Sequence, residues 1–377
     1  MSHRIDNFTP ASFLTQATNV RQRDLSKVDL LRKIPYKIMR IPELGALFNQ
    51  PREILLENYA ILARVFDGTG LINAGGVHGE RRLTGDYMFG FLGATTPLSQ
   101  SAWNIMAKVG SRLLFMNAEP HSSRSERLKR SQEVMESPIH YKTRAMIARN
   151  AVTDFMESLL DDLRPDKYSL PIDPPEGLDT EKRLLDHCGY RPRSVVWNRD
   201  RDDPEARAWI ARIAEFVTTC RQDVRVWTES SATGKGEVNS TGAVEEGPER
   251  FTALIYNLAR CHALIGGRLG IGMSDGGMVA SIAMSSLPDD RRKAIGLLIG
   301  GSRQGYHGTP LKFTVPDLAA GLARSDKTAR QVMEKLRILG IGRVISGRGS
   351  APTVFELNQD YAWLCGEEFG DMVSGHC

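Results

Sequence analysis

The sequence feature that most constrains the fold is the block at 314–358, TVPDLAAGLARSDKTARQVMEKLRILGIGRVISGRGSAPTVFELN. Thr314 is the predicted N-cap of a short helix, because Pro316 and Asp317 follow it in the first turn. Ser325 predicts the cap of a second helix whose apolar residues recur about every 3.6 residues, and Gly340 predicts its end. Two strand-like runs around a Gly-rich turn then predict a hairpin. Together these elements predict a winged helix over residues 288–358.

The second predicted helix of this block keeps basic and polar side chains on the side opposite its apolar stripe. In a winged helix this helix enters the DNA major groove, and the hairpin reaches backbone phosphates. From Arg291 to Arg348 there are twelve Lys or Arg and three acids, in a chain whose net charge is only +4. We expect the block to bind double-stranded DNA, with protein docking and a merely solvated face as the alternatives. The expected DNA contacts are Lys327, Thr328, Arg330, Gln331, Lys335 and Arg348.

Composition excludes several classes of protein. The 377 residues suffice for two or three domains, and no apolar run approaches the roughly 20 residues of a membrane span. The polar start MSHRIDNF lacks the apolar core of a signal segment, so we expect a cytoplasmic protein without a membrane partner. Five cysteines without a Cys-x-x-Cys pair predict neither a disulfide framework nor a zinc cluster. His78, His121 and His140 lack the spacing of metal ligands, so we expect no metal site.

The N-terminal block alternates strand-like and helix-like runs. Ile38–Ile41 predict an apolar strand that leads to the carboxylate of Glu43, and residues 52–66 have the periodicity of a helix. Two strands closed by a Gly-rich, basic tip follow. We expect Arg81 and Arg82 at this tip to contact DNA, with an ordinary exposed turn as the alternative.

Another apolar run, YMFGFLG at 87–93, leads to Thr95 and Thr96. Two interpretations are open. Either the buried strand presents the two hydroxyls to a ligand, or the threonines only form a turn or cap the next helix. The run RLLFMN, which begins at Arg112, predicts one more short strand. Further along, the sequence predicts helices at 204–220, 248–265 and 275–286. The run GMSDG opens the last of these, so we expect Ser274 or Asp275 to be its N-cap.

The order strand, acid, helix, hairpin, strand, polar tip and arginine resembles the second half of an AAA+ P-loop ATPase. The likeness is to minichromosome-maintenance-type helicases and related phage or mobile-element ATPases. It implies that Glu43 polarises the attacking water, that Thr95 or Thr96 senses the γ-phosphate, and that Arg112 reaches a neighbouring subunit's nucleotide. The run GPERFTALIYNLARCHALIGGRLG resembles the helical lid of that family, in which Arg250 occupies the position that touches nucleotide.

The phosphate-binding half of such an ATPase is missing from this sequence. No G-x-x-x-x-G-K-[ST] motif occurs, and Pro42 stands where the family places an aspartate that holds magnesium. We therefore expect ATP and Mg²⁺ to bind only if another chain supplies the P-loop. The chain alone is predicted not to hydrolyse ATP.

These observations predict a mixed α/β organisation. The predicted parts are a partial AAA+-like P-loop ATPase core at 1–120, an α-helical lid at 121–287 with exposed loops at 164–181 and 229–247, the α+β winged helix at 288–358, and a tail at 359–377. We expect a DNA-associated, helicase-type protein in the replication or mobilisation of a phage or plasmid-like element. Its expected partners are DNA and either copies of itself or a P-loop-bearing chain. The alternatives are a non-enzymatic winged-helix transcription regulator and a protein with only an assembly role.

Overall fold

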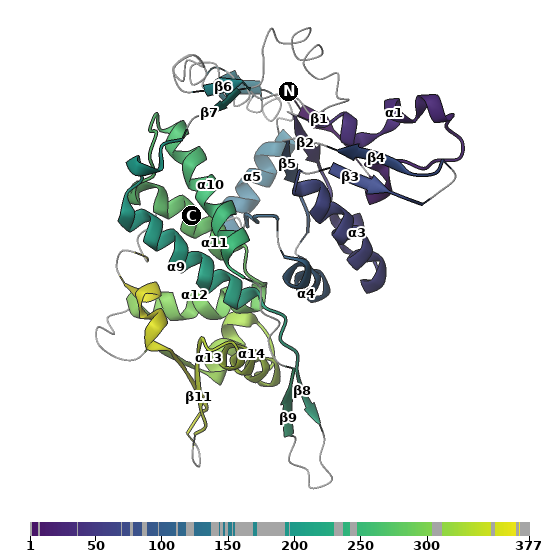
Figure 1. Ribbon diagram of the computed structural model, residues 1–377. Helices are drawn as coiled ribbons and strands as arrows, with labels where there is room; N and C mark the ends of the chain where they lie inside the picture. Colours follow the sequence, from purple (N-terminus) through teal and green to yellow (C-terminus); the bar gives the residue numbers. More distant parts are fainter. Residues whose placement is uncertain are drawn as a thin grey trace.

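The fold is mixed α/β, with many helices and small sheets (Figure 1). The computed structural model describes residues 2–6, 8–35, 37–68, 70–75, 78–84, 89–96, 98–110, 112–117, 124–136, 143, 146–147, 150–152, 154, 169–171, 193–195, 197–229, 237–241, 247–303, 311–347, 351–366 and 369. Among these residues, no helix has the length and apolar character that a membrane crossing requires. The buried apolar side chains gather in two clusters, an N-terminal core and a C-terminal core.

A small parallel sheet organises the N-terminal core. Its strands are β1 (Ser2–Arg4), β2 (Ile38–Ile41) and β5 (Gly90–Gly93), in the order β1–β2–β5. Helices α3 (Arg52–Phe66) and α4 (Gln100–Val109) pack on this core, whereas β3 (Gly70–Asn73) and β4 (Arg81–Thr84) form an antiparallel hairpin. Two short helices, α1 (Leu25–Val28) and α2 (Gly45–Phe48), complete the unit. The predicted strand at 38–41, the helix at 52–66 and the hairpin are confirmed. The predicted basic tip is not, because Arg81 and Arg82 lie in β4, paired with Asn73 and Ile72.

Two predictions in this unit need correction. The run RLLFMN is not a strand, because residues 112–117 have no regular secondary structure. Its side chains alternate between the two cores, with Leu113 and Phe115 on the N-terminal core and Leu114 on the C-terminal core. The segment packs between the two cores and does not pair with a strand. The backbone N of Phe115 donates to Ser286 Oγ at 2.9 Å. Strand β1 was not predicted, since three residues are too short to display an alternating pattern.

Three helices in the middle of the chain contribute to the C-terminal core. They are α9 (Pro204–Arg221), α10 (Glu249–Ile265) and α11 (Gly276–Ser285), which confirms the helices predicted there. The described residues of this region also include α5 (Arg124–Glu136) and two hairpins, β6 (Ser169–Pro171) with β7 (Arg193–Val195), and β8 (Val226–Glu229) with β9 (Glu237–Ser240). The loops predicted at 164–181 and 229–247 are therefore wrong at β6 and at β9. These short strands escape sequence analysis because their pairing, not an apolar pattern, defines them.

The C-terminal elements follow the order helix, strand, helix, helix, strand, strand. They are α12 (Asp289–Arg303), β10 (Lys312–Thr314), α13 (Val315–Leu322), α14 (Asp326–Ile338), β11 (Gly342–Ile345) and β12 (Val354–Leu357). The three strands form an antiparallel sheet in the order β10–β12–β11. The predicted helix, turn, helix and hairpin are confirmed, and β10 adds a third strand that the sequence analysis missed.

The residues predicted to begin and end helices α13 and α14 do so in the structure. Thr314 Oγ1 accepts from the backbone N of Asp317 at 3.3 Å, and Ser325 Oγ accepts from the backbone N of Thr328 at 3.4 Å. Ala323 takes the left-handed conformation (φ 51°) at the turn between α13 and α14, and Gly340 does so (φ 73°) after α14. The sequence therefore fixes the start and end of both helices through hydrogen bonds within a few residues.

The C-terminal core joins the predicted lid to the predicted winged helix. Side chains of α9, α10 and α11 belong to the same buried cluster as those of α12, α13, α14 and the sheet. Arg291 of α12 is 1% exposed, and its guanidinium donates to the carbonyls of Cys220 and Gln222 at the end of α9. The predicted tail also contributes, because residues 359–365 form a 3-10 helix whose Leu364 is buried in this core. The described elements from α9 to the 3-10 helix at 359–365 thus pack around one continuous core.

Candidate functional site

The outward side of α14 is the strongest candidate for a functional surface. Ala329, Val332, Met333 and Leu336 are buried, which turns the opposite side of the helix to solvent. Lys327 and Arg330 are exposed there, and Gln331 is half-buried beside them. Arg330 also donates to Thr353 Oγ1 at 3.2 Å, at the start of β12. The helix and the predicted wing are therefore held in one arrangement.

Several nearby cations are already neutralised by carboxylates. Lys335 Nζ pairs with Asp290 of α12 at 3.1 Å, and its side chain is 17% exposed. Arg337 pairs with Glu334, and Arg343 pairs across the strands with Glu356. In the part of the chain that the structure describes, Lys327 has no ion-pair partner. The available positive charge on this side is therefore concentrated at the first turns of α14.

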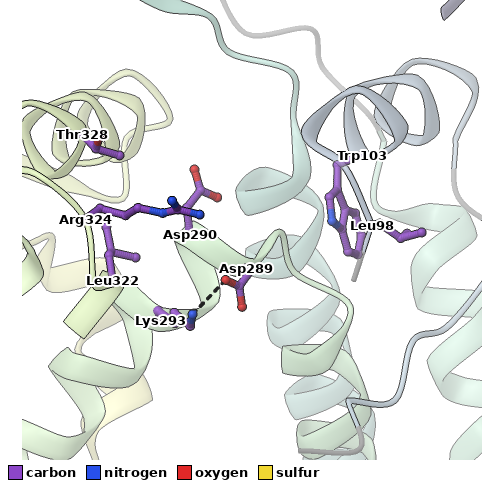
Figure 2. Close-up of a pocket in the computed structure, with 8 residues that line it drawn as sticks. All are labelled: Leu98, Trp103, Asp289, Asp290, Lys293, Leu322, Arg324 and Thr328. Carbon is purple, nitrogen blue, oxygen red and sulfur yellow. Dashed lines mark ion pairs between the residues drawn. The ribbon is translucent and has the colours of Figure 1, made fainter. Parts of the chain in front are cut away.

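A cavity of about 200 Å³ lies between α4 and the beginning of α14 (Figure 2). Figure 2 shows Trp103 of α4 across the gap from Arg324 and Thr328, with Lys293 and Asp289 of α12 between them. Lys293 Nζ pairs with Asp289 at 3.0 Å. Thr328, an expected DNA contact, thus faces α4, whereas Lys327 and Arg330 are exposed to solvent.

The other expected DNA contacts differ in their surroundings. Arg81 is 13% exposed and pairs at 2.5 Å with Asp29, whose side chain is fully buried. It also donates to the backbone carbonyl of Thr15, so it links the hairpin to the preceding loop. Arg82, one residue further along β4, is exposed. Arg348 lies outside the described residues.

Glu43 and the threonine pair both follow strands that end at the same edge of the parallel sheet. The register aligns Ile41 with Gly93, so both strands end side by side. The backbone N of Leu44 donates to the Ala94 carbonyl at 2.7 Å. Glu43 Oε1 accepts from the backbone N of Gly45 at 2.6 Å, which holds this carboxylate at the start of α2. Ser99, and neither threonine, caps α4 by accepting from the backbone N of Ala102.

Arg112 and Arg250, to which the ATPase resemblance gives roles, do not lie at this sheet edge. Arg112 Nε and Nη2 donate to the two carboxylate oxygens of Asp67, each at 3.0 Å, and its side chain is 11% exposed. Arg112 also donates to the Gly110 carbonyl at 2.7 Å. Arg250 is exposed at the second position of α10, in the unit built on the C-terminal core. Arg112 is thus a paired side chain of the N-terminal unit, and Arg250 belongs to the other unit.

Sequence analysis missed a buried carboxylate at the start of α11. Asp275 is 1% exposed and occupies the N-cap position of α11, as expected, but its side chain makes no capping hydrogen bond to that helix. It accepts two hydrogen bonds from Arg268, at 2.9 and 2.6 Å, and one from the backbone N of Gly272, and it lies 2.6 Å from His262 Nδ1. Burial alone would raise the pKa of Asp275, but these donors outweigh it and hold the pKa below its ordinary value. No local signal announces this cluster, since its members come from three elements.

Nothing in the described residues groups three or more His, Cys, Asp or Glu side chains in a way that would hold a metal ion. No protein-family model matches the sequence, and no curated protein matches it.

Proposed function

We propose that the elements from α12 to β12 form a winged helix that binds double-stranded DNA. The observation that carries this proposal is the exposed Lys327 and Arg330 on the first turns of α14, next to a hairpin that shares a hydrogen bond with that helix. The antiparallel sheet β10–β12–β11 supports it, because a strand between the first and second helices belongs to the winged-helix layout. Helix α14 enters the major groove, and the β11–β12 hairpin approaches the phosphates.

The proposed role is that of a DNA-associated, helicase-type protein of a phage or plasmid-like element, acting in the cytosol. The convergence of Glu43 and Thr95 at one sheet edge supports a partial AAA+-like core. In this proposal a P-loop from a partner chain or another copy brings ATP and Mg²⁺ to that edge, with Arg250 approaching from the helical lid. Arg112 would then have to leave Asp67 before it could reach a phosphate. We expect the purified chain alone to show no ATP turnover.

The rival function is that of a transcription regulator. The two functions differ in how strongly the protein prefers one DNA sequence over others. A regulator binds its target about 10³-fold or more tightly than random DNA, whereas a helicase-type module depends mainly on salt and little on sequence. Selection from a random duplex library at fixed salt separates the two.

The test of DNA binding compares two charge-reversed proteins by fluorescence anisotropy with a labelled duplex. Lys327→Glu with Arg330→Glu changes the proposed interface. Arg207→Glu with Arg212→Glu makes the same change of net charge on exposed positions of α9. We expect the first pair to weaken binding by roughly 10-fold or more and to lower the salt slope by about 2, because each lost phosphate contact lowers it by about 1.

The control pair should leave both quantities nearly unchanged. Equal weakening by the two pairs would mean that only net charge matters, which contradicts the assignment to α14. Unchanged binding in the first pair would favour protein docking through this face.

A further inference from the structure

The two flanks of helix α14 differ in what lies beside them. Thr328 and Lys335 are seven residues apart, about two helical turns, so they share one flank. Lys335 Nζ pairs with Asp290 of α12, and Asp290 and Thr328 both line the cavity beside α4. Lys327 and Arg330, which lie away from that flank, are exposed. One flank of the proposed DNA-binding helix is therefore covered, and the other is open.

A DNA duplex needs room on both flanks of a helix that enters its major groove. An α-helix with its side chains is about 10–12 Å across, and the groove is about 12 Å wide, so a sugar-phosphate strand lies close on each side. The cavity between α4 and the start of α14 has a volume of about 200 Å³, and a sphere of that volume is only about 7 Å across. This gap is narrower than the groove alone. A duplex therefore cannot seat the start of α14 while α4 stays in place.

The position of α4 depends on the segment that packs between the two cores. Phe115 of this segment packs against Trp103 of α4, with ring centroids 5.0 Å apart. The same residue is bonded to Ser286 at the end of α11, and its neighbour Leu114 packs on the C-terminal core. Helix α4 also contacts α9. These contacts hold α4 beside the start of α14.

Contact across the cavity itself is weak. The lining on the α4 side, Leu98 and Trp103, is apolar, whereas the opposite side carries Asp289, Lys293 and Arg324 (Figure 2). Lys293 Nζ pairs with Asp289 at 3.0 Å, so these two charges are satisfied without α4. An unfilled gap between apolar and charged side chains provides neither close packing nor hydrogen bonds. Moving α4 away from α14 therefore costs little at this surface.

We infer that the N-terminal unit restrains DNA binding: α4 covers the Thr328 flank of α14, and a duplex is admitted only when α4 moves away. This inference rests on the proposed DNA binding by α14 and adds its regulation. The apparent affinity of a protein scales with the fraction of molecules in the binding-competent arrangement. A change that favours the open arrangement therefore tightens DNA binding.

The test changes the charge at position 98, where the side chain is half-buried in the cavity wall. Leu98→Asp brings a carboxylate toward Asp289 and Asp290, and the repulsion should open the units and tighten binding to a labelled duplex by roughly 5-fold. Leu98→Lys should weaken binding by a similar factor, because the new cation is attracted to the same acids. Both shifts are opposite to the effect of net charge, since added cations favour binding to phosphate and added anions oppose it.

The matched control makes the same two changes at Ile72, which is 55% exposed on β3 of the same unit. There, Ile72→Asp should weaken binding slightly and Ile72→Lys should strengthen it slightly, as net charge dictates. Thermal unfolding followed by circular dichroism checks that each variant is folded. Leu98 variants that behave like the Ile72 variants would overturn the inference.

A second measurement reports the arrangement without relying on affinity. Photoreactive benzoylphenylalanine at position 98 of the full-length chain should cross-link to peptides that contain residues 289–293 or 322–328. Saturating duplex should reduce the yield of this link by at least about 3-fold, because the bound form is the open one. A link that is absent from the free protein, or that persists unchanged with duplex bound, would contradict the inference.

The two proposals fail in different ways. If neither wild type nor Leu98→Asp binds any duplex, the proposed function fails and this inference fails with it. If wild type binds duplex and the Leu98 variants follow net charge alone, only this inference fails.

Discussion

Replacing Arg291 by alanine tests whether the proposed DNA-binding unit is anchored to the helices before it. Arg291 lies in α12 and is 1% exposed, yet it is the group that satisfies carbonyls at the end of α9. Burial lowers its pKa, although a guanidinium titrates far above neutral pH and stays charged. The alanine variant therefore removes a buried cation together with its hydrogen bonds.

The expected loss follows from the two carbonyls. Cys220 and Gln222 each lose their donor from Arg291, and an unsatisfied buried group costs about 1–3 kcal/mol. Loss of the buried side chain adds a cavity, whereas release of a desolvated charge offsets part of the cost. We expect Arg291→Ala to lower the free energy of unfolding by about 3 kcal/mol, and Arg291→Lys to lower it by about half as much.

Guanidinium chloride unfolding at neutral pH measures this difference, with circular dichroism and tryptophan fluorescence as two probes. Because helices α9 to α14 and the β10–β12–β11 sheet share one core, both probes should report one transition for them. The control is Arg292→Ala, which removes a surface pair with Asp289 and should cost less than about 1 kcal/mol. A loss below about 1 kcal/mol for Arg291→Ala would refute the anchoring role.

Two other predictions concern stability. Asp275→Asn should lower the free energy of unfolding at pH 7 by about 2 kcal/mol, because it weakens charged hydrogen bonds from Arg268. The pKa of Asp275 is lower in the folded state than in the unfolded state. Its contribution to the free energy of unfolding is therefore complete above the ordinary carboxyl pKa and is lost as the pH falls through the folded pKa. The denaturation midpoints of wild type and variant should converge in acid. Ser325→Ala should cost about 1 kcal/mol through loss of the α14 cap in thermal or chemical unfolding, whereas Ser274→Ala, at an exposed position, should stay within about 0.5 kcal/mol. Equal effects of the two serine variants would contradict the capping argument.

The positions of the caps and of the apolar stripes could be predicted because they depend on residues close in sequence. Ile38–Ile41 and Arg52–Phe66 were predicted with their observed bounds, and Thr314, Ser325 and Gly340 occupy the predicted ends of helices. In each case the determining contact is a hydrogen bond within a few residues or a repeat of apolar positions.

The surroundings of the candidate site residues could not be predicted in the same way. From the sequence, Lys335 and Arg81 were predicted to contact DNA. In the fold, Asp290 and Asp29 lie beside them and form ion pairs with them. The two partners of each pair are 45 and 52 residues apart, so no local pattern connects them.

The sequence by itself determined where α3, α13 and α14 begin and end, and which side of α14 turns to solvent, because backbone capping and helical periodicity act over one or two turns. Only the tertiary structure decided that residues 112–117 pack between two cores instead of forming a strand, and that Asp275 is buried beneath Arg268 and His262. It also left the side chains of Ile38 and Leu92 on the parallel sheet exposed. Burial and charge pairing depend on which distant segments meet, and that is settled only when the chain has folded.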